Sequence, residues 1–222
     1  MKTNHNITLI GTIHKNKGIC TYTELCKIIE SINPEVIFEE KPPTYFDEYY
    51  TTKTRSNLES DAINLYLENH KATQVLVDYN IIPDETFFSN NRYMHFQIEK
   101  RSRGYRAIID TNSNYIENYG FNYLNSIECL KSHESLDNEI EETLKFINQE
   151  KLFPIRKAWL EWEEKRDNAM MINIYKYCKS NIFKTGLFLI GTAHRKSIIE
   201  KISEYNKKYN LNINWHYNFP IE

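Results

Sequence analysis

Two almost identical stretches decide the fold of this chain: LIGTIH at residues 9–14 and LIGTAH at residues 189–194. They agree at five of six positions, although 180 residues separate them along the chain. Each ends an apolar run of the kind that forms a buried strand. The match predicts two strands with equivalent roles, each ending in a Gly-Thr-x-His motif.

Strand and helix patterns alternate on either side of these motifs. We expect strands at 7–13, 35–40, 74–77, 187–192 and 213–217, and helices at 21–32, 57–69, 155–180 and 197–209. This alternation is typical of an α/β fold with a mostly parallel central sheet covered by helices. The polar, aromatic-rich stretch from 83 to about 155 predicts a helical insertion within one domain spanning 1–222.

Composition narrows the class of protein. The 222 residues are 41% hydrophobic and 26% charged, which is ordinary for a globular chain. A net charge of −2 gives no electrostatic reason to expect nucleic acid or an anionic membrane as partner. The sequence contains neither a signal peptide nor an apolar run of about 20 residues. The four cysteines lack C-x-x-C spacing, so we expect reduced thiols in a cytoplasmic protein.

The two motif histidines are the first candidate site residues. Ligands of parallel α/β sheets bind at the carboxyl ends of strands, where His14 and His194 are expected. The preceding glycines allow backbone and ligand to approach closely. Two imidazoles at adjacent strand ends could share a metal ion, or one could bind it while the other handles protons. Alternatively, Gly-Thr only ends each strand and each histidine caps the next helix.

Carboxylates follow two other predicted strands. Glu39 and Glu40 come after Val36-Ile37-Phe38, and Asp78 ends the third strand. Side chains alternate across a strand, so only one of the two glutamates should face the same way as its apolar neighbours. Borderline divalent metals accept carboxylate together with imidazole, so a glutamate here could complete a His/Glu/His set. The alternative is a strand end with two solvated charges.

Arg166 lies in the middle of an apolar helix face. At about 100° per residue, one stripe of the last long helix carries Trp159, Trp162, Arg166, Met170, Asn173 and Tyr177. The guanidinium keeps its charge and needs an acceptor, so Arg166 could orient a carboxylate or a substrate carbonyl. Alternatively, its stem packs between the tryptophans and its head lies in water. Asp167 is expected to be solvated.

The order of these motifs resembles the TraB/Tiki superfamily, which is related to erythromycin esterase-like proteins. The similarity lies in Gly-Thr-x-His, Asn33-Pro34-x-Val-x-x-Glu, a strand ending in Asp, Lys-Arg-Asp-x-x-Met and a closing Gly-Thr-x-His, over about 1–80 and 160–217. It implies an α/β sandwich and, from Tiki members, a metal-dependent protease. Carried over by motif, His14, Glu39 and His194 would be the metal ligands, and Arg166 the helix arginine. Tiki proteins are membrane-tethered, and this chain shows no anchor.

The main hypothesis is a metal-dependent hydrolase of peptide or other acyl bonds. A divalent ion (Mn, Co or Zn) on His14, Glu39 and His194 would polarise the carbonyl and acidify a bound water. Glu40 or Asp78 could serve as general base, and Arg166 could stabilise negative charge.

Two alternatives belong to other classes of function. A non-catalytic regulatory protein of the same fold could bind a peptide or small molecule. A phosphoester hydrolase could grip phosphate with Arg101, Arg103 and Arg106, although such a cluster is more often a solvated face.

Overall fold

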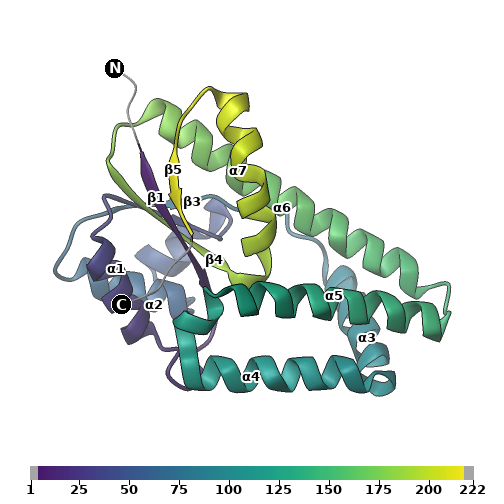
Figure 1. Ribbon diagram of the computed structural model, residues 1–222. Coiled ribbons are helices and arrows are strands. Elements are labelled where there is room, and N and C mark those ends of the chain that lie inside the picture. Colours follow the sequence, from purple (N-terminus) through teal and green to yellow (C-terminus); the bar gives the residue numbers. More distant parts are fainter. Residues whose placement is uncertain (1–4, 218–222) are drawn as a thin grey trace.

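The computed structural model describes residues 5–217, and its centre is a five-stranded parallel sheet (Figure 1). The strands lie in the order β3-β2-β4-β1-β5. They are β1 (Asn6–Thr12), β2 (Val36–Glu39), β3 (Thr73–Leu76), β4 (Thr185–Gly191) and β5 (Asn214–His216). All the strand pairs are parallel, so the predicted α/β fold with a mostly parallel sheet is confirmed.

Helices cover both faces of the sheet. One face is covered by α1 (Tyr22–Ile32) and α2 (Leu58–Leu67), and the other by α6 (Leu152–Ser180) and α7 (Arg195–Tyr209) (Figure 1). α1 begins where the Thr21 hydroxyl accepts a hydrogen bond from the backbone of Glu24. It ends at Asn33, whose left-handed conformation (φ 47°) closes the helix just before Pro34, as the sequence predicts.

β1 and β4 pair one residue out of step with their matching motifs. Gly11 lies opposite Ile190, and Thr12 lies opposite Gly191. Partners in register share a face and side chains alternate along a strand, so identical motif residues face opposite sides. Leu9 packs in the core under α6 and α7, whereas Leu189 packs in the core under α1 and α2. The two motifs are therefore not equivalent in space, contrary to the expectation from their sequences.

The predicted insertion is helical. It consists of α3 (Glu85–Arg101), α4 (Arg103–Leu124) and α5 (Ile127–Ile147), and α4 and α5 run side by side below the sheet (Figure 1). These helices and the start of α6 share a separate apolar cluster of Met94, Ile98, Ile140, Leu144 and Leu152. The insertion thus has core contacts of its own, in addition to those it makes with the sheet.

All four cysteines are free and buried, in keeping with the expected reduced thiols. Among residues 5–217, no helix combines the length and apolar character needed to cross a membrane.

Asn125 joins the insertion to the sheet beside the first motif. β5 pairs with β1 only over Asn6–Thr8, so the backbone of Gly11 has no strand partner on that side. The Asn125 amide takes this place, with Oδ1 accepting from Gly11 N at 2.7 Å and Nδ2 donating to Gly11 O at 3.1 Å. The asparagine is 3% exposed, so it, and not bulk water, pairs these two backbone groups.

We predict that Asn125→Ala lowers the free energy of unfolding by about 2–3 kcal/mol, because it leaves two buried backbone groups unpaired. Urea unfolding followed by circular dichroism measures the change. Asn118→Ala, which removes an exposed asparagine from α4, is the matched control and should change stability by about 0.5 kcal/mol or less. Equal stability of the two variants would show that the Asn125 bridge is not needed.

Candidate functional site

The carboxyl-terminal edge of the sheet gathers most of the predicted site residues. His14 follows β1, Glu40 follows β2, Asp78 follows β3 and His194 follows β4. Because the strands are parallel, these four ends lie along one edge, and α6 brings Arg166 to the same place. Strand direction alone therefore explains why residues from four distant parts of the chain meet here.

Arg166 is embedded among carboxylates. Its Nε lies 3.2 Å from both Asp78 oxygens, and its Nη2 donates to Asp78 Oδ2 at 2.8 Å. The same Nη2 donates to Glu40 Oε1. The side chain is only 13% exposed, and its guanidinium carbon lies 4.8 Å from the centre of the Trp162 ring. The head group is thus paired inside the protein, whereas the snorkelling alternative required it to lie in water.

His194 is buried on the α6 side of the edge. Nδ1 lies 2.6 Å from Asp167 Oδ1, and Nε2 lies 3.2 Å from Glu40 Oε1. His194 directly precedes α7, but its side chain makes no capping hydrogen bond there, so the capping alternative does not describe it. Asp167 is 4% exposed, and the expectation that it is solvated is wrong. Asp167 lies beside the apolar stripe of α6, but His194 packs against that flank of the helix.

The charge state of His194 follows from its surroundings. Burial alone would lower its pKa, but Glu40 and Asp167 outweigh this effect and raise the pKa to about 10. Nε2 also lies 2.9 Å from Nη1 of Arg166, which could donate to a neutral ring. However, one arginine faces four carboxylates here, and this excess of negative charge favours a protonated ring. The carboxylates are those of Glu40, Asp78, Glu163 and Asp167. We call Arg166, His194 and these four acidic residues the Arg166 cluster.

Glu40 stands between the two histidines. Its Oε2 accepts a hydrogen bond from the backbone N–H of Gly191, while Oε1 contacts His194 and Arg166. A Cβ added at Gly191 would lie 3.0 Å from Glu40 Oε2 and 3.6 Å from Nε2 of His14, so glycine makes this close approach possible. Burial would raise the pKa of Glu40, but His194 and Arg166 hold that pKa well below its ordinary value.

His14 forms a separate pair with Glu59. Its Nδ1 lies 3.1 Å from Oε1 of Glu59, which also accepts from the Thr12 hydroxyl at 2.5 Å. The His14 side chain is 57% exposed, whereas the glutamate is buried. The hydrogen bond to Glu59 raises the pKa of His14 above its ordinary value, against a smaller opposing effect of burial. Sequence reasoning missed Glu59 because it lies in the first turn of α2, far from any strand end.

A small cavity lies next to the His14 ring. It is lined by His14, Glu39, Glu40, Lys41, Asn57, Glu59 and Leu189. Its volume of about 10 Å³ is close to the least that holds one water molecule. Two buried oxygens of its lining residues, Glu39 Oε1 and Glu59 Oε2, have no hydrogen-bond partner among residues 5–217. Buried acceptors are normally paired, so this His14 cavity is suited to a donor such as water.

The predicted metal ligands do not fit a shared ion. Glu39 accepts from Lys41 Nζ at 2.5 Å and from the Tyr50 hydroxyl, on the α1–α2 side of the sheet. His194 points to the α6 side, where both of its nitrogens face other partners. Within the described part of the chain, no three His, Cys, Asp or Glu side chains are grouped so as to hold a metal ion. We therefore derive no chemistry through the predicted His14/Glu39/His194 set.

The three arginines considered for phosphate binding lie around the turn between α3 and α4, outside the stretches that resemble the TraB/Tiki superfamily. Arg101 donates to the backbone and side chain of Gln97, and Arg106 donates to the backbone oxygen of Glu99. These hydrogen bonds lie at the exposed ends of the two helices. They do not connect this basic cluster to the carboxyl-terminal edge of the sheet.

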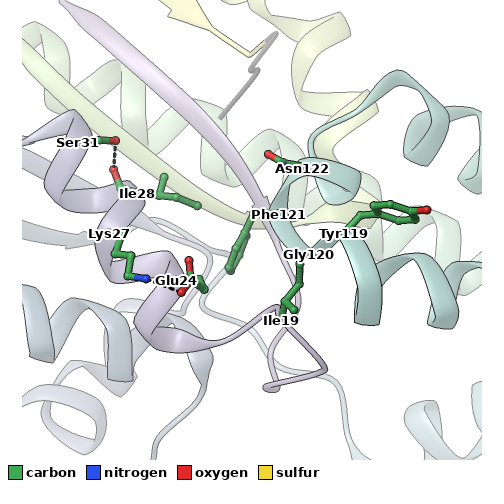
Figure 2. A pocket seen from close by; sticks show the side chains of 9 residues that line it. All are labelled: Ile19, Glu24, Lys27, Ile28, Ser31, Tyr119, Gly120, Phe121 and Asn122. Atoms are coloured by element: carbon green, nitrogen blue, oxygen red, sulfur yellow. Dashed lines mark hydrogen bonds and ion pairs between the residues drawn. The ribbon is translucent and has the colours of Figure 1, made fainter. Parts of the chain in front are cut away.

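A second hollow lies away from the predicted residues. Figure 2 shows this pocket of about 260 Å³ between α1 and the end of α4. Its walls are Ile19, Glu24, Lys27, Ile28, Ser31, Tyr119, Gly120, Phe121 and Asn122. Gly120 has φ 51° and interrupts α4, which brings Phe121 against the sheet. None of the candidate catalytic residues lines this pocket, so we do not assign the chemistry to it.

Comparison with known proteins finds no match for the chain among protein-family models, curated proteins or solved structures. The resemblance to the TraB/Tiki superfamily therefore stays a prediction.

We predict that the His194 ring stays protonated at pH 8. Because its pKa is raised, the stability it contributes is fully present below about pH 6.5, the unfolded value, and is lost as the pH rises through about 10. An NMR titration of histidine ring signals, with urea-unfolded protein as reference, measures this directly. Asp167→Asn should move the His194 midpoint down, and a ring that is neutral at pH 7.5 in the unchanged protein would contradict the assignment.

Proposed function

We propose that this chain hydrolyses ester or peptide bonds, with His14 and Glu59 activating a water molecule held in the His14 cavity. One observation carries the proposal. An exposed imidazole is backed by a buried carboxylate, beside a cavity whose size and unpaired acceptors suit one water. A carboxylate that orients an imidazole is a recurrent arrangement for general base catalysis.

The proton transfers follow from the His14–Glu59 hydrogen bond. Glu59 accepts from Nδ1–H, so a neutral His14 ring has its lone pair on Nε2. Nε2 takes a proton from the water, and the water oxygen attacks the carbonyl carbon. The resulting tetrahedral intermediate collapses when His14 returns the proton to the leaving oxygen or nitrogen. The products are a carboxylic acid and an alcohol or amine, and His14 is neutral again.

Lys41 is our candidate for stabilising the negative charge that develops on the carbonyl oxygen. It lines the His14 cavity and donates to Glu39. An ammonium has three N–H donors, and Glu39 is its one hydrogen-bond partner among the described residues. A preorganised cation beside the cavity would favour the intermediate over the bound substrate.

The Arg166 cluster has a supporting role in this proposal. Asp78 holds Arg166, Arg166 holds Glu40, and Glu40 in turn fixes the backbone of Gly191 next to the His14 ring. We therefore assign Glu40, Asp78 and Arg166 to positioning. The general base role considered for Glu40 and Asp78 from the sequence passes to His14.

Variants of the His14–Glu59 pair test the proposal. Screened against a panel of p-nitrophenyl esters and short peptides, His14→Ala and Glu59→Gln should each lower kcat by about 10²–10⁴-fold, because general base catalysis is lost. His216→Ala removes an exposed histidine of β5 and serves as the control. Normal turnover in His14→Ala would sink the proposal.

The pH dependence offers a second test. The neutral ring is the base, and Glu59 raises the pKa of His14, so kcat/KM should rise with pH and level off above an apparent pKa higher than 6.5. Glu59→Gln should shift that apparent pKa downward. The opposite slope, with activity falling as the pH rises from 6 to 8, would contradict a neutral histidine base.

Chelation separates this proposal from the metal-dependent hydrolase and from a binding protein. We expect turnover to survive treatment with EDTA. Loss of activity that Mn²⁺, Co²⁺ or Zn²⁺ restores would favour the metal mechanism instead. No turnover on any substrate, together with ligand-dependent thermal stabilisation, would indicate the non-catalytic protein.

A further inference from the structure

Asn57 lines the His14 cavity and also begins helix α2. Its Oδ1 accepts a hydrogen bond from the backbone N–H of Ser60 at 2.9 Å. In return, the Ser60 hydroxyl accepts from the backbone N–H of Asn57 at 2.9 Å and donates to the Asn57 backbone oxygen at 3.0 Å. This arrangement is a capping box, which holds both the side chain and the backbone of the capping residue. The fold of α2 therefore fixes the orientation of the Asn57 amide.

The capping box uses the oxygen of the Asn57 amide and leaves its nitrogen available. A backbone N–H can only donate, so the atom that faces Ser60 must be the amide oxygen. Nδ2 lies on the other side of the amide group and makes no hydrogen bond among residues 5–217. Unlike the two unpaired oxygens of the cavity, on Glu39 and Glu59, it is not closed off from solvent. Asn57 thus offers a neutral donor that a bound molecule can reach.

The first turn of α2 places this donor next to the catalytic base. The backbone N–H of Leu58, the next residue, donates to the backbone oxygen of His14 at 3.3 Å. Glu59, one residue further on, accepts the hydrogen bond from the His14 ring. Three consecutive residues therefore supply an amide donor, a backbone contact to the His14 segment and the carboxylate that orients its ring.

A substrate carbonyl has to meet its donors at the mouth of the cavity. The cavity measures about 10 Å³, which leaves room for the attacking water alone. The carbonyl must therefore approach from the side on which the His14 ring is exposed. Lys41 is only 5% exposed, whereas Asn57 is partly exposed. Asn57 can thus contact the carbonyl oxygen directly, while the Lys41 ammonium acts from within the protein.

We infer that Asn57 is a second oxyanion donor of the proposed hydrolase, with its Nδ2 donating to the carbonyl oxygen of the substrate. The inference rests on the proposed function, since an oxyanion forms only if a carbonyl is attacked. The hydrogen bond strengthens as negative charge develops on that oxygen, so it favours the tetrahedral intermediate over the bound substrate. Because Asn57 begins α2, the positive end of the helix dipole adds to this stabilisation.

The variant Asn57→Ser separates the capping role of Asn57 from its donor role. It keeps an N-cap oxygen but removes the amide, so Tm should change by less than about 2 °C while kcat falls about 10²–10³-fold. KM should change little, because the donor acts on the intermediate. The apparent pKa of the kcat/KM profile should stay in place, because no charge is added next to His14.

Asp84→Ala is the matched control. It removes the side-chain cap of α3, and Asp84 is not part of the cavity wall. Loss of this cap should lower Tm by about 2–4 °C and leave kcat unchanged. If Asn57→Ser keeps normal kcat, or if its loss of kcat comes with a shifted apparent pKa, the inference is overturned while the hydrolase stands.

Phenylboronic acid tests the donor without turnover. Its boron takes hydroxide from the cavity water while His14 takes the remaining proton, which gives a tetrahedral anion that resembles the intermediate. Boron NMR titration should show that Asn57→Ser binds this probe about tenfold more weakly than the unchanged protein, and that Asp84→Ala binds it equally well. If this difference is found and no ester or peptide is cleaved, the donor site stands and the proposed function fails. Equal affinity of Asn57→Ser and the unchanged protein, or no affinity in either, overturns the inference.

Discussion

The parallel pairing of β1 with β4 is the constraint on which the rest of the site depends. Seven consecutive residue pairs fix the two strands side by side, although most of the chain lies between them. The pairing sets both Gly-Thr-x-His motifs at one edge of the sheet. Because its register is one residue out of step with the motifs, it also sends their side chains to opposite faces. The edge is thereby divided into a His14 side and a His194 side, with Glu40 between them.

The two sides differ in their electrostatics. On the α6 side, the Arg166 cluster places four carboxylates, one arginine and one histidine largely out of solvent. Such burial is tolerated only where each charge has partners, and here nearly every polar atom has one. A cluster paired in this way has few groups left for a substrate. On the other side, the exposed His14 ring and the unpaired oxygens of the His14 cavity leave capacity for binding and proton transfer. This contrast is why we assign positioning to one side and chemistry to the other.

The helical insertion contributes to both parts of the molecule. Asn125, at the turn between α4 and α5, completes the hydrogen bonding of Gly11 where β5 is too short to reach. At the other end of the insertion, α3 packs against α6 and forms a mainly apolar pocket beside Trp159. The insertion therefore supports the first motif and also shapes the surface next to Arg166. Both effects arise from side chains that have no recognisable motif.

The sequence by itself determined the fold class, the order of the strands and of the helices outside the insertion, and the placement of His14, Glu40, Asp78 and His194 at strand ends, because apolar periodicity is a local property. For Arg166 it left two interpretations open. It did not determine register, and a shift of one residue reverses which face each side chain occupies. For that reason the sequence could not show that Glu40, and not Glu39, lies between the histidines. The sequence also could not predict that Glu59 and Asp167 pair with the two histidines, since each lies on a helix whose packing brings it to its histidine. Only the tertiary structure decides such contacts, because they depend on how separately formed elements pack.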